Sequence, residues 1–295
     1  MGCQPTKIND TAQQSTMIKP FNTHQLETEE FQRRTGDRIQ KKSVELDVDY
    51  NTEEYLRDDR FFFPQKPVKS FRDELHGNSH FIKEWMKRYP NISIQDQTEQ
   101  AARGILYEAE LLNQQFEGDW FSKQLQQVKD KDRTDILKCC ISLYTTEGFL
   151  YKLINKTLRD NDMSKLDTLG AYCDFLYQCD ASRAFSMNSY TGLVYRGAHL
   201  DSHMISNYQE AVGTEKAWDA FTSTSKNRTK AERFGNTLFI INIKNSKYVR
   251  GLDISPYSKY PTEEEVLISA ARIFHIDKID YDDTTMKHYI YLTID

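Results

Sequence analysis

The stretch GLVYRGA, from Gly192 to Ala198, marks the point where the character of the chain changes. Upstream of it, four segments carry apolar residues at helical spacing: 98–116 (with Thr98 as expected N-cap), 132–144, 146–160 and 164–184. Downstream, Gly, Asn, Asp and Pro separate short β-rich runs that read FTSTS, TLFIINI, EVLIS, RIFHI and HYIYLTI. Because the helices precede the strands instead of alternating with them, the sequence predicts an α+β fold: N-terminal helices followed by a mixed, mostly antiparallel β-sandwich.

The polarity of the chain divides it into three expected parts. Residues 1–58 are polar, with few aromatic residues and no sustained periodicity, which is typical of a flexible tail. Residues 59–130 begin at an aromatic cluster, RFFFPQKPV, and are predicted to form an N-terminal helical extension. Residues 131–295 contain the change from helices to strands and are expected to form the functional domain.

The composition is that of a polar protein with enough aromatic side chains for a packed core. The 295 residues include 16 Phe and 17 Tyr, the mean hydropathy is −0.72 and the formal net charge is −5. This acidic balance argues against a nucleic-acid partner, because a general nucleic-acid binder is usually basic. No apolar run of about 18 residues predicts a membrane span, and no secretory leader is expected.

The cysteines form no pattern that binds metal or predicts a disulfide framework. The five residues are odd in number, Cys139 and Cys140 are adjacent, and no two are spaced as CxxC. We therefore expect no metal site, and reduced thiols in a cytosolic compartment for all except Cys3.

The first residues, MGCQPTKIND, fit a lipidation pattern. Gly2 with Thr6 matches the N-myristoylation pattern, and palmitoylation of Cys3 would add the second signal that stable anchoring needs. A basic cluster at residues 33–42 adds attraction to anionic lipid. We expect a peripheral protein, anchored to the inner leaflet on the cytoplasmic face of a membrane and otherwise cytoplasmic. The alternative is a plain tail.

Two small motifs follow one another in the strand-rich half. Arg196 ends a β-run directly before Gly197, where a forked guanidinium suits phosphate or carboxylate binding and a glycine lets a ligand approach the backbone. In FTSTS, strand alternation places Ser223 and Ser225 on one face, where hydroxyls can orient a neighbouring group. Each motif alone is more often an ordinary feature of a strand than part of a site.

The third motif, EEEVLI, sets three glutamates against an apolar run. Residues two apart on a strand share a face, so Glu263 and Glu265 are predicted to point together and Glu264 to point away. The alternative is a solvated strand edge whose charges prevent pairing with another edge. That alternative explains exposed charges, but it does not explain why they adjoin three residue types that are usually buried in strands.

Arg, Ser-Thr-Ser and Glu-x-Glu in this order closely resemble the motifs of the arginine-directed mono-ADP-ribosyltransferases. This is the family of the cholera-toxin-like and clostridial binary toxins and of the vertebrate ecto-enzymes, and the resemblance implies a sandwich of the ADP-ribosyltransferase type. SPYSKYP, before the glutamates, resembles the family's mobile substrate-recognition loop. Upstream, YKLINKTLR resembles the family's Y-x-x-I-N-x-x-L-R element, which reaches the phosphates of NAD. On a helix, three residues of this segment share one face: Tyr151, Asn155 and Arg159.

The resemblance implies NAD as co-substrate and, as partner, an acceptor protein with an exposed arginine. Glu265 would stabilise the positive charge that develops on the ribose, and Ser223 would hold Glu265 in place. Glu263 would steer the acceptor guanidinium and take its proton. Arg196 would bind the phosphate side of NAD, and Phe234 would stack on nicotinamide. The implied NAD-binding set is Tyr151, Asn155, Arg159, Arg196, Gly197, Ser223, Phe234 and Glu265.

Two departures from the family pattern limit this reading. After Phe234 the chain reads GNT, without the arginine that some toxin members place there, which weakens a second phosphate contact in that loop. Arg196 stands where the poly-ADP-ribosylating relatives have histidine, which disfavours chain elongation. Two other interpretations stay open: an NAD glycohydrolase, for which Glu263 matters little, and a catalytically silent, membrane-tethered NAD-binding or scaffold module.

Overall fold

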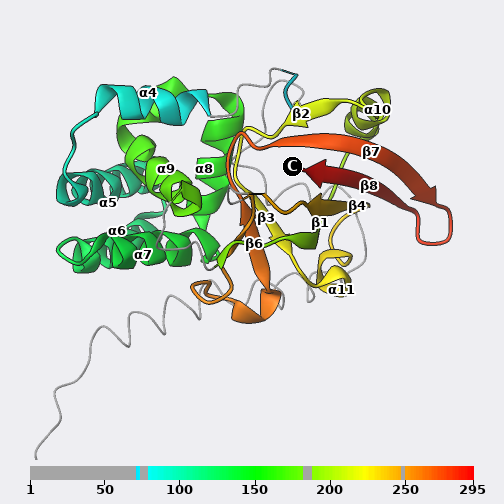
Figure 1. Cartoon of the computed structure of the whole chain (residues 1–295). Coiled ribbons are helices and arrows are strands. Elements are labelled where there is room, and N and C mark those ends of the chain that lie inside the picture. The colour runs from blue at the N-terminus through cyan, green and yellow to red at the C-terminus, as the bar shows by residue number, and fades with distance from the viewer. Residues whose placement is uncertain (1–70, 74–78, 182–187, 247–249) are drawn as a thin grey trace, which may run out of the picture.

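The computed structural model places helices on one side of the molecule and strands on the other (Figure 1). It describes residues 71–73, 79–181, 188–246 and 250–295. The expected tail, with Gly2 and Cys3, lies outside the described residues. Within the described residues, none of the helices combines the length and the apolar character needed to cross a membrane.

The helical half of the described chain runs from α4 to α9. Its elements are α4 (His80–Arg88), α5 (Ile94–Leu111), α6 (Gln115–Val128), α7 (Arg133–Thr145), α8 (Phe149–Asp160), the 3-10 turn η1 (Met163–Lys165) and α9 (Leu166–Ala181). The helices α7, α8 and α9 lie where the apolar spacing predicts them. Their apolar faces share one core with residues of the strand half, among them Phe221 and Leu267.

The first predicted helix, at 98–116, differs from the structure. Helix α5 begins earlier, at Ile94, and its N-cap is Ser93, whose Oγ accepts a hydrogen bond from the Asp96 N–H at 3.0 Å. The expected cap, Thr98, lies inside the helix and donates from Oγ1 to the Ile94 carbonyl at 2.7 Å. Helix α6 is missing from the prediction because its polar sequence contains few apolar residues; those that are buried are Trp120, Phe121 and Leu125.

The strands form one hydrogen-bonded sheet in the order β2-β7-β8-β4-β1-β3-β6-β5. The pairing of β4 with β8 is parallel and the other pairings are antiparallel, which confirms a mixed, mostly antiparallel sheet. The elements of this half are β1 (Gly192–Ala198), α10 (Ser202–Glu210), β2 (Glu215–Ala217), β3 (Thr222–Ser225), α11 (Arg228–Ala231), β4 (Thr237–Ile243), β5 (Leu252–Asp253), the 3-10 turn η3 (Pro261–Glu263), β6 (Glu265–Ile268), β7 (Ile273–Asp282) and β8 (Lys287–Ile294).

The junction between β1 and β3 is the narrowest in the sheet, because a single residue pair, Tyr195 with Ser225, joins the two strands. Beyond this junction, β3 and β6 run in a different direction from β7 and β8 (Figure 1). Val266 and Ile268 of β6 are buried in the same apolar cluster as Phe274 of β7. The two parts of the sheet therefore face each other across a shared core, as the layers of a sandwich do.

Strand β6 is buried on both faces, which explains the apolar run that follows the glutamates. Val266 and Ile268 contribute to the core of the sheet, whereas Leu267 belongs to the cluster that the helices form. This division follows from the alternation of side chains along a strand. The strand that begins with Glu265 is thus held between two cores.

Candidate active site

Arg196 lies on β1, beside the narrow junction of the sheet. Strand β1 pairs with β4 along its whole length, but its other edge pairs with β3 only at Tyr195. Next to that pair, Nη1 of Arg196 donates a hydrogen bond to the carbonyl oxygen of Ser223 at 2.8 Å. This charge-assisted hydrogen bond to the backbone of the neighbouring strand fixes the position of the guanidinium relative to β3.

Strand β3 has the predicted alternation, with its threonines buried and its serines partly exposed. Thr224 donates from Oγ1 to the carbonyl of Val266 at 2.7 Å, on the buried face. Ser225 donates from Oγ to the carbonyl of Glu263 at 2.6 Å. The hydroxyls of β3 therefore bond to both the strand and the turn that carry the glutamates.

The paired glutamates do not share a strand. Glu265 is the first residue of β6 and is 3% exposed, whereas Glu263 ends the turn η3 and is partly exposed. Between them, Glu264 has a φ of +51°, in the left-handed region that non-glycine residues rarely adopt. The argument from strand periodicity is therefore wrong for this pair, because β6 begins only at its second glutamate.

The predicted residues of the strand half nevertheless come together in one open cleft with a volume of about 150 Å³. Its walls are formed by strands β1, β3 and β6, by helix α11, by Phe234 and by the glutamate turn (residues 261–264). The lining residues are Tyr195, Arg196, Gly197, Ser223, Thr224, Ser225, Lys230, Ala231, Phe234, Glu263 and Glu265. The cleft thus contains two carboxylates and a guanidinium, with hydroxyls and an aromatic ring between them.

Gly197 lines the cleft, and close packing within the protein requires a glycine at this position. A Cβ atom at this position would lie 2.0 Å from the carbonyl oxygen of Ala231 and 2.8 Å from Cβ of Phe234. The missing side chain lets the segment after α11 lie against β1, and this contact places Phe234 in the cleft wall. The structure thus gives a packing reason for the glycine, and the approach of a ligand at this position stays a prediction.

The three residues of the Y-x-x-I-N-x-x-L-R element lie on α8, and within the described part of the chain they do not line the cleft. Tyr151 Oη donates to the carboxylate of Glu147 at 3.3 Å, and Arg159 is exposed in the last turn of the helix. Asn155 donates from Nδ2 to the hydroxyl of Tyr144 at 2.9 Å. Of the three, Asn155 has the contact that leads towards the site.

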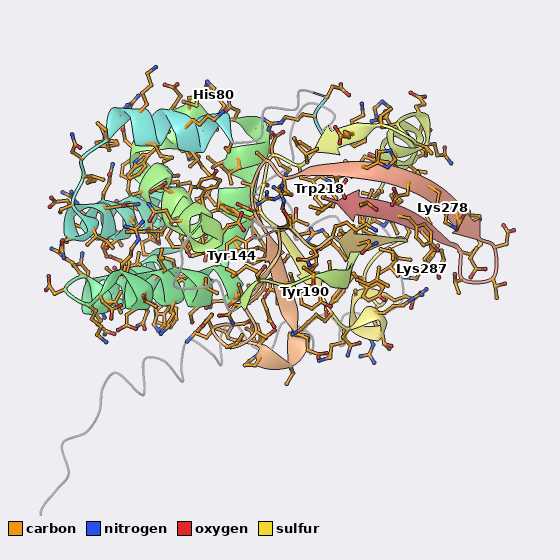
Figure 2. The ribbon with its side chains drawn as sticks, in the orientation of Figure 1. His80, Tyr144, Tyr190, Trp218, Lys278 and Lys287 are labelled. Carbon is orange, nitrogen blue, oxygen red and sulfur yellow. The ribbon has the colours of Figure 1, made fainter. Side chains whose placement is uncertain are left out.

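Tyr144 connects α8 to the cleft and is missing from the sequence-based site. It is buried at the end of α7, packs edge-on against Phe221 with ring centroids 6.0 Å apart, and lies where the helical half meets the strands (Figure 2). Burial raises the pKa of its phenol, while hydrogen bonds with Asn155 and Ser223 act in the opposite direction. The neutral hydroxyl accepts a hydrogen bond from Asn155 and lies near enough to Ser223 to interact with it. In the sequence, Tyr144 is one of five residues at apolar spacing in the segment 132–144, so no local signal distinguishes it.

The thiols of the helical half are not arranged for chemistry. Burial raises the pKa of Cys139 to about 12, and it also raises the pKa of each neighbouring thiol: Cys140, Cys173 and Cys179. Protonated, buried thiols are poor nucleophiles. Within the described ranges, no group of three or more His, Cys, Asp or Glu side chains is placed to hold a metal ion.

Comparison with known proteins gives the family. Residues 94–293 match the family described as NAD:arginine ADP-ribosyltransferase, which covers more than half of the chain. The protein belongs to this family. The match begins at the first residue of α5, so it includes α5 and α6 as well as the region in which the motifs occur.

Three individual proteins that match this chain share between 16% and 34% of the aligned residues with it. A stretch of 104 residues is 34% identical to a protein of Mycobacterium avium (strain 104) that is provisionally named NAD(+)–arginine ADP-ribosyltransferase Mav; it covers 34% of this chain and 12% of the length of Mav. The crystal structure of the type III effector XopAI from Xanthomonas axonopodis pv. citri has a TM-score of 0.52 at 16% identity, and covers 74% of this chain and 99% of that one. This likeness shows the fold alone. ADP-ribosyltransferase HopU1 of Pseudomonas syringae pv. tomato DC3000 has a TM-score of 0.47 at 20% identity, and covers 75% of this chain and 100% of that one.

Proposed function

We propose that this protein is an NAD-dependent mono-ADP-ribosyltransferase that modifies arginine side chains of acceptor proteins and releases nicotinamide. The observation that carries the proposal is the convergence of Arg196, Ser223, Glu263 and Glu265 on one cleft, in a chain of the arginine ADP-ribosyltransferase family. These residues come from β1, β3, η3 and β6, and only the fold brings them together.

The first half of the reaction breaks the bond between nicotinamide and ribose. Nicotinamide leaves with the bonding electron pair as a neutral molecule, and positive charge develops on the sugar. We assign Glu265 to this charge, because its carboxylate is held in a buried, low-dielectric position at the start of β6, where electrostatic stabilisation is strong. Arg196 is assigned to the phosphates of NAD, and its bond to the Ser223 carbonyl orients the guanidinium.

The second half forms a bond from an acceptor nitrogen to the same sugar carbon. A free guanidinium has a pKa above about 12, so it is protonated and weakly nucleophilic. A base must take one proton as the new bond forms, and we assign this role to Glu263. Glu263 suits the role because it lines the cleft from a turn and is partly exposed, so a side chain of another protein can reach it.

The proposal is tested by incubating the full-length protein with labelled NAD, with and without agmatine as an arginine analogue. We expect both nicotinamide release and labelled agmatine. Release without labelled agmatine, at saturating agmatine and in the presence of polyarginine, would identify an NAD glycohydrolase instead. Binding of NAD without release of nicotinamide would identify a silent binding module, and either result would overturn the proposal.

We further propose that lipid at Gly2 and Cys3 holds the protein on the cytoplasmic face of a membrane. The support is the sequence pattern alone, in which one acyl chain is insufficient and the adjacent cysteine provides a second. Fractionation of cells that express the wild type and Gly2→Ala tests this. The variant is expected in the soluble fraction, and membrane association equal to that of the wild type would remove the proposal.

A further inference from the structure

The segment from the end of β3 into α11, residues 225–230, makes a series of contacts with the glutamate turn. The backbone N–H of Lys226 donates to the carbonyl of Glu264 at 3.0 Å, and the side chain of Lys230 donates to the carbonyl of Thr262. Together with the bond from Ser225 to the Glu263 carbonyl, these contacts engage three consecutive carbonyls from one short segment. The turn that carries Glu263 is therefore held from outside β6.

Glu264 is the residue of this turn that adopts a left-handed backbone conformation. Its positive φ reverses the chain between η3 and β6, and its own N–H donates to the Pro261 carbonyl at 3.2 Å. A left-handed conformation at a non-glycine residue is strained, and it persists where the surroundings determine it. Asn227 contributes to those surroundings, because its Nδ2 donates to Oε2 of Glu264 at 3.3 Å.

The orientation of the Asn227 amide is determined by its other contacts. Its Oδ1 accepts from the N–H of Lys230 at 3.2 Å and so caps α11, which requires the Nδ2 end to face Glu264. Its backbone N–H donates to Oγ of Ser225 at 2.9 Å, the same hydroxyl that bonds to the Glu263 carbonyl. Asn227 thus connects the cap of α11, the end of β3 and the glutamate turn.

Glu265 is held differently. It pairs with Ser225 in the ladder between β3 and β6, and its carbonyl accepts from the N–H of Ile254 at 3.0 Å. The residues that follow it are buried in two cores, so a shift of the turn does not require a shift of β6. A disturbance at Glu264 should therefore reach Glu263 before it reaches Glu265.

We propose that Asn227 and Glu264 are positioning residues that fix the Glu263 carboxylate for transfer to arginine, which makes the middle glutamate a functional residue rather than an outward-facing bystander. The inference rests on the proposed function, since it assigns a role in the transfer half of that reaction. It assigns no role in NAD cleavage to either residue.

The test exchanges the donor and the acceptor of the pair. Asn227→Asp keeps an N-cap for α11 but sets a carboxylate against Glu264, so the contact becomes repulsive. Glu264→Gln keeps an acceptor oxygen for Asn227 and is the matched control. The double variant, which combines Asn227→Asp with Glu264→Gln, restores a hydrogen bond of reversed polarity, from the side-chain amide at position 264 to the carboxylate at position 227.

Steady-state kinetics of the full-length variants separate the two halves of the reaction. For Asn227→Asp we expect transfer to agmatine to fall about tenfold, because small misplacements of a reacting group have effects of this size. Nicotinamide release without agmatine and the KM for NAD should stay close to wild-type values. Glu264→Gln should transfer normally, and the double variant should regain most of the lost transfer.

Three results would overturn the inference. Unchanged transfer in Asn227→Asp would show that the contact does not position Glu263. An equal loss of transfer and release, accompanied by a lower Tm, would indicate a purely structural role, as would a double variant that is no better than Asn227→Asp. A wild type that releases nicotinamide but never labels agmatine would refute the proposed function itself, and is distinguished by the wild-type reaction alone.

Discussion

Glu265 is the first residue of a strand that is buried on both faces, whereas Glu263, two residues earlier, ends a 3-10 turn and lines the same cleft. The strand is held by two apolar cores and by ladders to β3 and β5. The turn is held by a few hydrogen bonds from the chain between the end of β3 and α11, at Ser225, Asn227 and Lys230. The comparison teaches that one motif can combine a carboxylate held in a doubly buried strand with a carboxylate held by a hydrogen-bonded turn, and that the two can change independently.

The largest expected effect comes from the buried member of the pair. Glu265→Gln keeps the shape of the side chain but removes the charge that stabilises the ribose, so nicotinamide release and transfer to agmatine should both fall about 10²- to 10³-fold. Chromatographic assay of both products, with circular dichroism as a control for folding, checks this. Substantial release by the variant would mean that Glu265 is not the group at the sugar.

Glu263→Gln should separate the two activities. Transfer to agmatine should fall about 10²-fold or more, because the guanidinium loses its base, while nicotinamide release should change only a few-fold. The ratio of labelled agmatine to released nicotinamide is the decisive quantity. If that ratio equals the wild-type ratio, the division between the two glutamates is incorrect.

Tyr144→Phe tests the part of the site next to the helical half, where β6 and its Glu265 are buried. Removing the hydroxyl leaves the Asn155 amide without the acceptor that it has in the structure, a type of loss that costs about 1–3 kcal/mol in a buried site. It also removes the interaction of the hydroxyl with Ser223. Release and transfer should fall together, by about three- to tenfold, if a part of that cost reaches the transition state.

The matched control for this change is Tyr172→Phe. Tyr172 is also fully buried, and its hydroxyl donates to the carbonyl of Cys140 at 2.7 Å. This substitution should lower Tm with little effect on either activity. Equal losses of activity in the two variants would show that buried tyrosines act only through stability.

Lys259→Met tests the loop that leads into the turn of Glu263, and it should have the smallest effect. Lys259 lies in the SPYSKYP loop, where its backbone N–H donates to Thr145 at 3.0 Å and its ammonium lies 5.4 Å from the centre of the Trp120 ring. Burial lowers the pKa of this lysine. Loss of the cation–π contact, worth about 0.5–2 kcal/mol, should loosen the loop and raise the KM for agmatine two- to fivefold, without a change in the KM for NAD.

The control for the loop is Lys278→Met. Lys278 makes a similar contact with the Tyr291 ring, at 4.3 Å, on the β7–β8 hairpin at the far end of the molecule (Figure 2). Neither KM should change in this variant. A change in the KM for NAD in Lys259→Met would place the loop at the NAD side of the cleft instead.

The fold class and the polar members of the cleft are accessible from the sequence because they depend on local patterns. The order of helices and strands predicts the α+β arrangement, and the motif residues at Arg196, Ser223, Glu263 and Glu265 are adjacent to recognisable β-runs. Periodicity fails where polar residues dilute it, as in α6, and where an element ends within a motif, as it does between Glu263 and Glu265.

The remaining parts of the site depend on contacts between distant segments. Tyr144 reaches Ser223 across the junction of the two halves, and Asn227 meets Glu264 from another strand end. Gly197 is required by the chain at Ala231, which lies more than thirty residues away. No local spacing encodes such pairs, because they arise only when the sheet order β1-β3-β6 has formed.

The position of β6 between two cores also has a thermodynamic consequence. Leu267 faces the helices and Val266 faces the sheet, so Glu265 is in place only when the helical half is docked on the strands. A ligand that binds this docked state preferentially must stabilise the docking itself, by linkage. Saturation with NAD should accordingly slow amide hydrogen exchange in α7 and α9, at sites remote from the cleft, as well as in the strands that line it.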